Sequence, residues 1–247
     1  MPKTIFRSTE KSNFILNMTE EQYSKLASIG LAMACFMVSL FTIIPEITIN
    51  STYTIAAGGL AVSGVYCMIM AFIAFIKKYI KGGTVFPVCA FGAMTLWAVI
   101  SLAASGDKYI GLYGFPQRAE GLLAIIFYFC IFVTGAAIKR RKAVETVIYS
   151  VIGTGILNSV FALVQIFTGK LSHYRMISLD IQTNSASGLA HSPLFLAMVL
   201  TLSLTAALIS AVTNESKKIR VISIVSSLLF GFVMIMTYSF IGICGIV

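Results

Sequence analysis

Two polar segments of this chain carry residue types that could hold an anion or move a proton. In the first, Arg118 follows Pro116 and precedes Glu120, directly before a long apolar run. Proline is tolerated in the first turn of a helix, so we expect a helix to begin here with Glu120 in its first turn. An arginine beside the positive end of a helix favours an anion, especially phosphate. Alternatively, Arg118 extends to lipid headgroups and Glu120 only stabilises the helix end.

The second polar segment, residues 169–186, gathers cationic and titratable side chains. It contains Lys170, His173 and Arg175. Because imidazole changes charge near neutral pH, His173 could act as a general base, and the two cations could bind an anionic substrate. The alternative is a solvated loop at a membrane surface.

A further histidine, His191, lies in a later apolar run close to Pro193. A histidine at membrane depth is a candidate catalytic residue, although it could instead hydrogen-bond to a neighbouring helix. The sequence contains no nucleotide-binding motif, no HExxH, no GxSxG and no CxxC pair. We therefore expect neither a metal nor a cofactor, and any chemistry must use a substrate that is already activated.

The composition indicates that these residues are positioned by membrane helices. Of the 247 residues, 58% are hydrophobic and 11% are charged, and the mean hydropathy is +0.93. Soluble domains carry about 25% charged residues. The sequence predicts an all-α, polytopic membrane protein with a polar N-terminal segment, residues 1–26, and a transmembrane domain, residues 27–247. The apolar runs predict about seven spans, at residues 27–47, 54–76, 84–104, 119–138, 144–168, 187–212 and 219–238.

The basic residues predict an orientation for these spans. Fourteen of the 18 lie in segments on one side: the N-terminal segment and the turns near residues 77–81, 139–142 and 217–220. The positive-inside rule places that side, and the N-terminus, in the cytoplasm. The net charge of +9 then reflects orientation, so nucleic acid is not an expected partner. The other four basic residues are predicted to lie on the outer side: Lys108, Arg118, Lys170 and Arg175.

Polar side chains also occur within the fifth predicted span. Thr154, Asn158 and Gln165 are four and seven residues apart and share one helical face. We expect them to hold neighbouring helices together rather than contact a substrate.

The stretch GLYGFPQRAEGLLAIIFYF resembles the R-x-x-G-hydrophobic signature of the O-antigen ligase and Wzy-type polymerase superfamily. SASGLAHSPLFLAMVL is similar to that family's G-small-x-N-P-N span, and TYSFIG to its T-x-S-R-x-small segment. His191-Ser192-Pro193 stands where the family has an asparagine-proline pattern, and Phe240 where it has an arginine.

The resemblance implies a membrane glycosyltransferase of polysaccharide biosynthesis in the bacterial cell envelope. Such enzymes move a glycan from undecaprenyl diphosphate to a glycan or lipid acceptor at the outer face of the cytoplasmic membrane, without a cofactor. It implies that Arg118 binds the diphosphate, with Gln117 and Glu120 beside it. It also implies that this chain is the N-terminal part of such an enzyme, with the catalytic base beyond it and His173 and His191 as substitutes.

Two other functions fit the sequence. A transporter or flippase for lipid-linked sugars would need a polar path through the middle of the membrane, for which Asn158 and Gln165 are the candidates. A non-catalytic membrane subunit or fragment would need neither a catalytic site nor a transport path.

Overall fold

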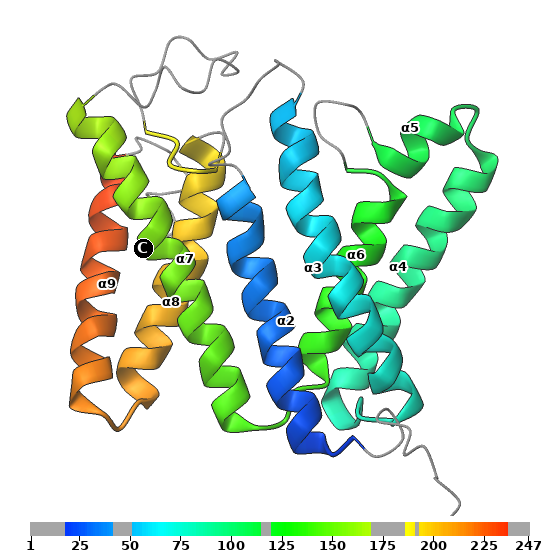
Figure 1. Ribbon diagram of the computed structural model, residues 1–247, viewed down its shortest axis with the longest axis horizontal. Helices are drawn as coiled ribbons and strands as arrows, with labels where there is room; N and C mark the ends of the chain where they lie inside the picture. The colour runs from blue at the N-terminus through cyan, green and yellow to red at the C-terminus, as the bar shows by residue number, and fades with distance from the viewer. Residues whose placement is uncertain (1–17, 42–50, 115–119, 169–185, 191–192, 237–247) are drawn as a thin grey trace, which may run out of the picture.

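The computed structural model describes residues 18–41, 51–114, 120–168, 186–190 and 193–236. Within them the chain is helical and contains no strand, which confirms the predicted all-α class (Figure 1). The elements are α2 (Glu20–Phe41), α3 (Ser51–Ile76), the 3-10 helix η1 (Gly82–Thr84), α4 (Val85–Ala104), α5 (Lys108–Tyr113), α6 (Leu122–Ala136), α7 (Arg141–Thr168), α8 (Pro193–Thr213) and α9 (Lys217–Met236).

Five of these helical segments are long and apolar enough to cross a membrane, as expected of a multi-pass membrane protein. They are Gly58–Ile76, Gly82–Ala104, Arg141–Phe167, Pro193–Thr213 and Lys217–Met236. The predicted count of seven is not confirmed. The first predicted span falls on α2, whose amino end carries Glu20, Glu21 and Lys25, and the fourth falls on α6, which has only 15 residues.

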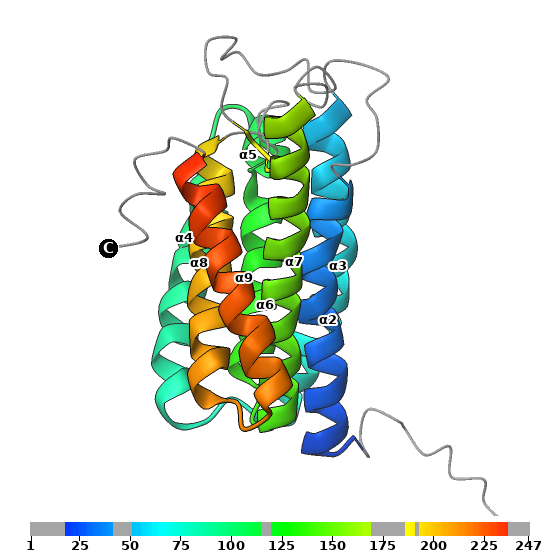
Figure 2. The same cartoon turned by 90° about the vertical axis from the view of Figure 1, so that its left-hand side faces the viewer.

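The long helices run alternately up and down and form two packed groups (Figures 1 and 2). In one group, α2 packs on α3 and α3 packs on α6, with α4 attached to the outside of α6. In the other, α7, α8 and α9 pack on one another. Each group has its own buried apolar core, one around Cys67 and Val133 and the other around Leu200 and Phe230. The two groups are joined mainly where α2 packs on α7.

Glycines allow the closest of these helix contacts. A Cβ atom at Gly64 in α3 would overlap the Phe127 side chain of α6. A Cβ atom at Gly155 in α7 would lie 2.5 Å from the Cβ of Ser203 in α8 and 2.9 Å from the ring of Phe230 in α9. Lipid is as apolar as the helix surface, so helix association in a membrane depends on such close packing and on hydrogen bonds between helices.

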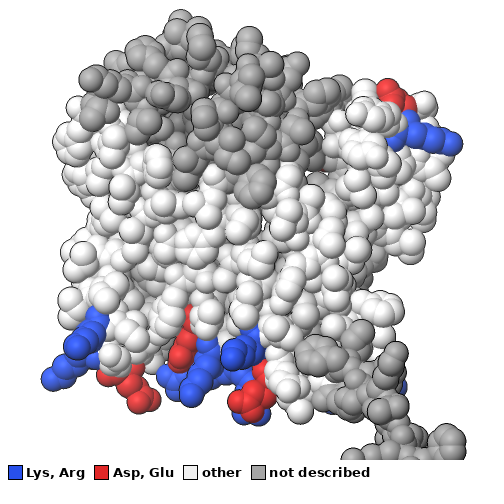
Figure 3. Space-filling model, in the orientation of Figure 1, with Lys and Arg blue, Asp and Glu red and all other residues white. Residues whose placement is uncertain are grey.

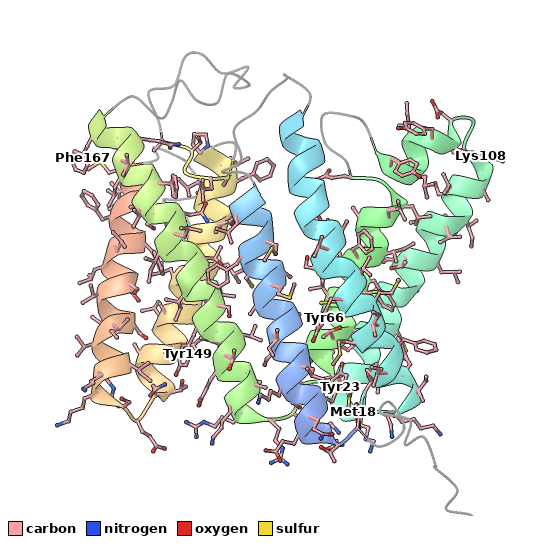
Figure 4. All side chains as sticks on the ribbon, viewed as in Figure 1. Met18, Tyr23, Tyr66, Lys108, Tyr149 and Phe167 are labelled. Carbon is pink, nitrogen blue, oxygen red and sulfur yellow. The ribbon has the colours of Figure 1, made fainter. Side chains whose placement is uncertain are left out.

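Charge is strongly segregated along the bundle. Most Lys and Arg visible in Figure 3 gather at one end, formed by the start of α2 and by the α3–α4, α6–α7 and α8–α9 turns. We call this the basic end and the opposite one the cavity end. Among the described basic residues, Lys108 is the exception and lies at the cavity end (Figure 4). This pattern agrees with the alternation of charge predicted from the sequence.

The packing at Gly155 can be tested directly. Gly155→Val should destabilise the protein by about 1–3 kcal/mol, because the added side chain must displace Ser203 or Phe230. Thermal unfolding in detergent measures this change. The matched control is Gly231→Val in α9, where an added Cβ meets no atom within 4 Å. Equal stability of the two variants would contradict the proposed α7–α8–α9 packing.

Candidate functional site

Most of the candidate residues lie outside the part of the chain that the structure describes. Gln117, Arg118, Lys170, His173, Arg175 and His191 belong to this set. Glu120 is described, is exposed and lies at the cavity end, immediately before α6.

Glu120 borders a cavity of about 390 Å³ between α4, α5 and α6. Most of its wall is apolar, contributed by residues such as Leu102, Ile110 and Ile125. The lining residues with polar side chains are Ser101, Ser105 and Glu120. Its volume is within the range of about 300–1,000 Å³ that is usual for small-molecule sites. The two serines did not stand out from the sequence, although their spacing of four residues places them on one face of a helix.

The short helix α5 covers this cavity and was not predicted, because it lies between the spans expected at residues 84–104 and 119–138. Asp107 begins the helix: one oxygen of its carboxylate accepts hydrogen bonds from the backbone N–H groups of Tyr109 and Ile110, both at 3.1 Å. Aspartate is a common capping residue at the start of a helix, so Asp107 is the residue from which the start of α5 could have been predicted. Tyr109 and Tyr113 lie one turn apart on α5, are exposed, and have ring centroids 5.0 Å apart.

The start of α6 corrects the expected position of Glu120. The helix begins at Leu122 after an extended Gly121, so Glu120 lies outside the first turn, and no side chain caps the helix. The physical reason is the contact between this segment and the end of α5. A Cβ atom at Gly121 would overlap the carbonyl oxygen of Leu112 and the nitrogen of Gly114, so only glycine permits this approach.

A second structured feature of the cavity end is the non-helical segment 186–190, held against α7 by side-chain amides. The Gln165 oxygen accepts hydrogen bonds from the N–H groups of Ser187 (3.0 Å) and Gly188 (2.8 Å). The Gln165 nitrogen donates to the carbonyl of Gly188 at 3.0 Å. The Asn158 oxygen accepts from the N–H of Leu189 at 3.3 Å. These bonds supply partners to backbone groups that no helix satisfies, as an apolar environment requires.

This segment also corrects the expected start of the sixth span. The span was expected to begin at residue 187, but α8 begins at Pro193. Gly188 has a φ of 55°, a left-handed conformation that interrupts a helix and favours glycine. The shared face of Asn158 and Gln165 therefore has a structural role, as predicted, but its partner is irregular backbone as well as helix: Asn158 also donates to the Ser39 hydroxyl of α2 at 3.4 Å.

Within the described residues, no group of three or more His, Cys, Asp or Glu side chains could hold a metal ion. The described cysteines, Cys35, Cys67, Cys89 and Cys130, are free thiols. No family model matches this chain, and no curated protein or solved structure matches it either.

We expect Gln165→Leu to release segment 186–190 from α7. The substitution removes three hydrogen bonds and leaves two amide donors without a partner, which should cost about 2 kcal/mol of stability. Hydrogen exchange of the peptide covering this segment should accelerate. Thr205→Val is the control, because the exposed Thr205 hydroxyl only donates to Thr201 in its own helix. Unchanged exchange in Gln165→Leu would show that the amide does not hold the segment.

Proposed function

We propose that this protein is a glycosyltransferase of the bacterial cytoplasmic membrane, similar to O-antigen ligases and polymerases. It would transfer a glycan from undecaprenyl diphosphate to a glycan or lipid acceptor at the outer face of the membrane. The observation that carries the proposal is the segregation of charge along the bundle. If the basic end faces the cytoplasm, the segment that contains Arg118 emerges on the outer side, where lipid-linked glycans are joined.

The chemistry at that end follows from the leaving group. When the acceptor hydroxyl attacks the anomeric carbon and gives its proton to a base, the bond to the diphosphate oxygen breaks and negative charge builds on the diphosphate. A fixed arginine and unpaired N–H groups at the start of a helix stabilise such charge. Arg118 lies two residues before Glu120, and the start of α6 carries no side-chain cap that would compete for its N–H groups.

A transporter is supported less well. Such a protein needs polar groups that face a path through the middle of the membrane. The two polar candidates, Asn158 and Gln165, use their amides to bind segment 186–190 and α2. Their hydrogen-bonding groups are therefore used within the protein and do not line a transport path.

Replacement of Arg118 tests the proposed chemistry. We expect Arg118→Ala to lower glycan transfer by roughly 10²–10³-fold, the usual effect of removing one group that stabilises transition-state charge. Arg118→Lys keeps the charge but loses the paired hydrogen bonds, so partial activity is expected. Lys108→Ala, which removes the basic residue of α5, is the matched control and should leave transfer unchanged. Transfer at the normal level in membrane-inserted Arg118→Ala would rule out the role assigned to Arg118.

The proposed orientation can be measured independently of activity. A cysteine introduced at Arg118 should react with a membrane-impermeant thiol reagent added outside intact cells, and a cysteine at Lys217 should not. Lys217 begins α9 at the basic end. Labelling of position 217 but not of position 118 would reverse the orientation and contradict the proposed function.

A further inference from the structure

The basic end is not uniformly available to a partner, because ion pairs neutralise part of it. Lys139 pairs with Glu20 at 3.3 Å and Arg140 with Glu21 at 3.5 Å, which ties the α6–α7 turn to the start of α2. Arg141 pairs with Glu145 at 2.9 Å within α7. Three charges of the run Lys139–Lys142, the densest basic run of the sequence, are thus matched by carboxylates.

The turn between α3 and α4, unlike the α6–α7 turn, has basic residues with no acidic residue nearby in the sequence. Residues 77–84 include three lysines and no acidic residue. Lys78 and Lys81 are exposed, and neither forms an ion pair within the described residues. The nearby carboxylate of Glu20, which together with burial raises the pKa of Tyr79, is already paired with Lys139. Positive charge therefore remains uncompensated at this turn.

The turn is also held in a fixed shape. Tyr79 is buried, its hydroxyl donates to the carbonyl of Met18 at 2.9 Å, and its ring lies 5.0 Å from that of Tyr23 (centroid to centroid). Met18 and Tyr23 are labelled at this end of the bundle in Figure 4. Lys78 has a φ of 53°, a conformation that is unfavourable for lysine. Because Tyr79 anchors the turn, the two exposed lysines project from a fixed backbone.

Large apolar side chains are close to these lysines in the sequence, on both helices. At the end of α3, Phe75 is 49% exposed, and at the start of α4, Phe86 is 82% exposed. In a membrane these side chains would contact acyl chains just below the headgroups that the lysines reach. Lysines at the headgroup level with apolar side chains beneath them match the anionic headgroup and the acyl chains of a phospholipid.

We propose that the α3–α4 turn is a binding site for an anionic phospholipid such as phosphatidylglycerol. Lys78 and Lys81 bind the headgroup phosphate, and Phe75 and Phe86 contact the acyl chains. The site lies at the end opposite Glu120 and does not depend on the proposed glycosyl transfer.

The single tryptophan of the chain makes this site measurable. Phe86→Trp in a Trp97→Phe background places the only tryptophan at the proposed site. The full chain is reconstituted in phosphatidylcholine bilayers, and brominated phosphatidylglycerol or brominated phosphatidylcholine is added to quench the fluorescence. At about fivefold preference per lysine, we expect the anionic lipid to bind roughly 25-fold more tightly here. Trp97 itself, about 16 Å further along α4, should show no preference.

Two charge variants distinguish a defined site from general attraction. Lys78→Gln with Lys81→Gln should abolish the preference at position 86, while Lys217→Gln with Lys218→Gln, equal in charge and at the same end, should leave it unchanged. Quenching by both lipids alike in the unaltered turn would overturn the proposal. The proposal would also be overturned if both double variants lost the preference for the anionic lipid equally. That result would mean that the overall positive charge of this end, and not a defined site, attracts the lipid. Displacement of the lipid by soluble glycerol phosphate at millimolar concentration would identify a phosphate site instead of a lipid site.

Discussion

The cost of placing charge or an unpaired backbone group in hydrocarbon determines how this chain is arranged. Every charged residue in the described part of the chain lies at or near one of the two ends of the bundle. Between the ends, the buried polar side chains of the described residues are neutral, and several of them donate to backbone carbonyls of a neighbouring helix. Thr134 of α6 donates to the carbonyl of Cys67 in α3 at 3.0 Å, and Ser203 of α8 donates to that of Val151 in α7 at 3.1 Å. The same constraint explains why Asn158 and Gln165 are needed where segment 186–190 leaves helical geometry.

Features that depend on local composition could be predicted from the sequence. The apolar runs gave the approximate position of each long helix, because length and hydropathy are properties of contiguous residues. The alternation of basic turns likewise followed from counting charges between runs. The helical face shared by Asn158 and Gln165 was visible from their spacing, and its structural role was anticipated.

Features that depend on contacts between distant residues could not be predicted. The length of α6 is limited by the approach of Gly121 to Leu112 and Gly114, and the delayed start of α8 by hydrogen bonds from α7. The pairing of Lys139 and Arg140 with Glu20 and Glu21 joins residues 119 positions apart in the chain. The sequence could therefore identify the basic run at 139–142, but not that its charge is largely neutralised and that the shorter 77–81 turn retains more free charge. For the candidate site, only the position of Glu120 can be compared with its prediction, and it lies two residues outside the helix.

The short length of α6 connects the fold to the proposed chemistry. Its 15 residues span about 22 Å, whereas the 20 residues of α4 span about 30 Å, the thickness of the hydrocarbon layer. Because α6 ends close to the basic end, as α4 begins there, the shortfall falls mainly at the cavity end. The recess that results is the cavity that α5 covers and Glu120 borders. The N–H groups of this helix start are set back from the end of α4, so in the proposed function the diphosphate of the donor would enter the recess to reach them. A polar helix terminus in such a recess is costly unless it has a partner, and in the proposed function the anionic donor group would be that partner.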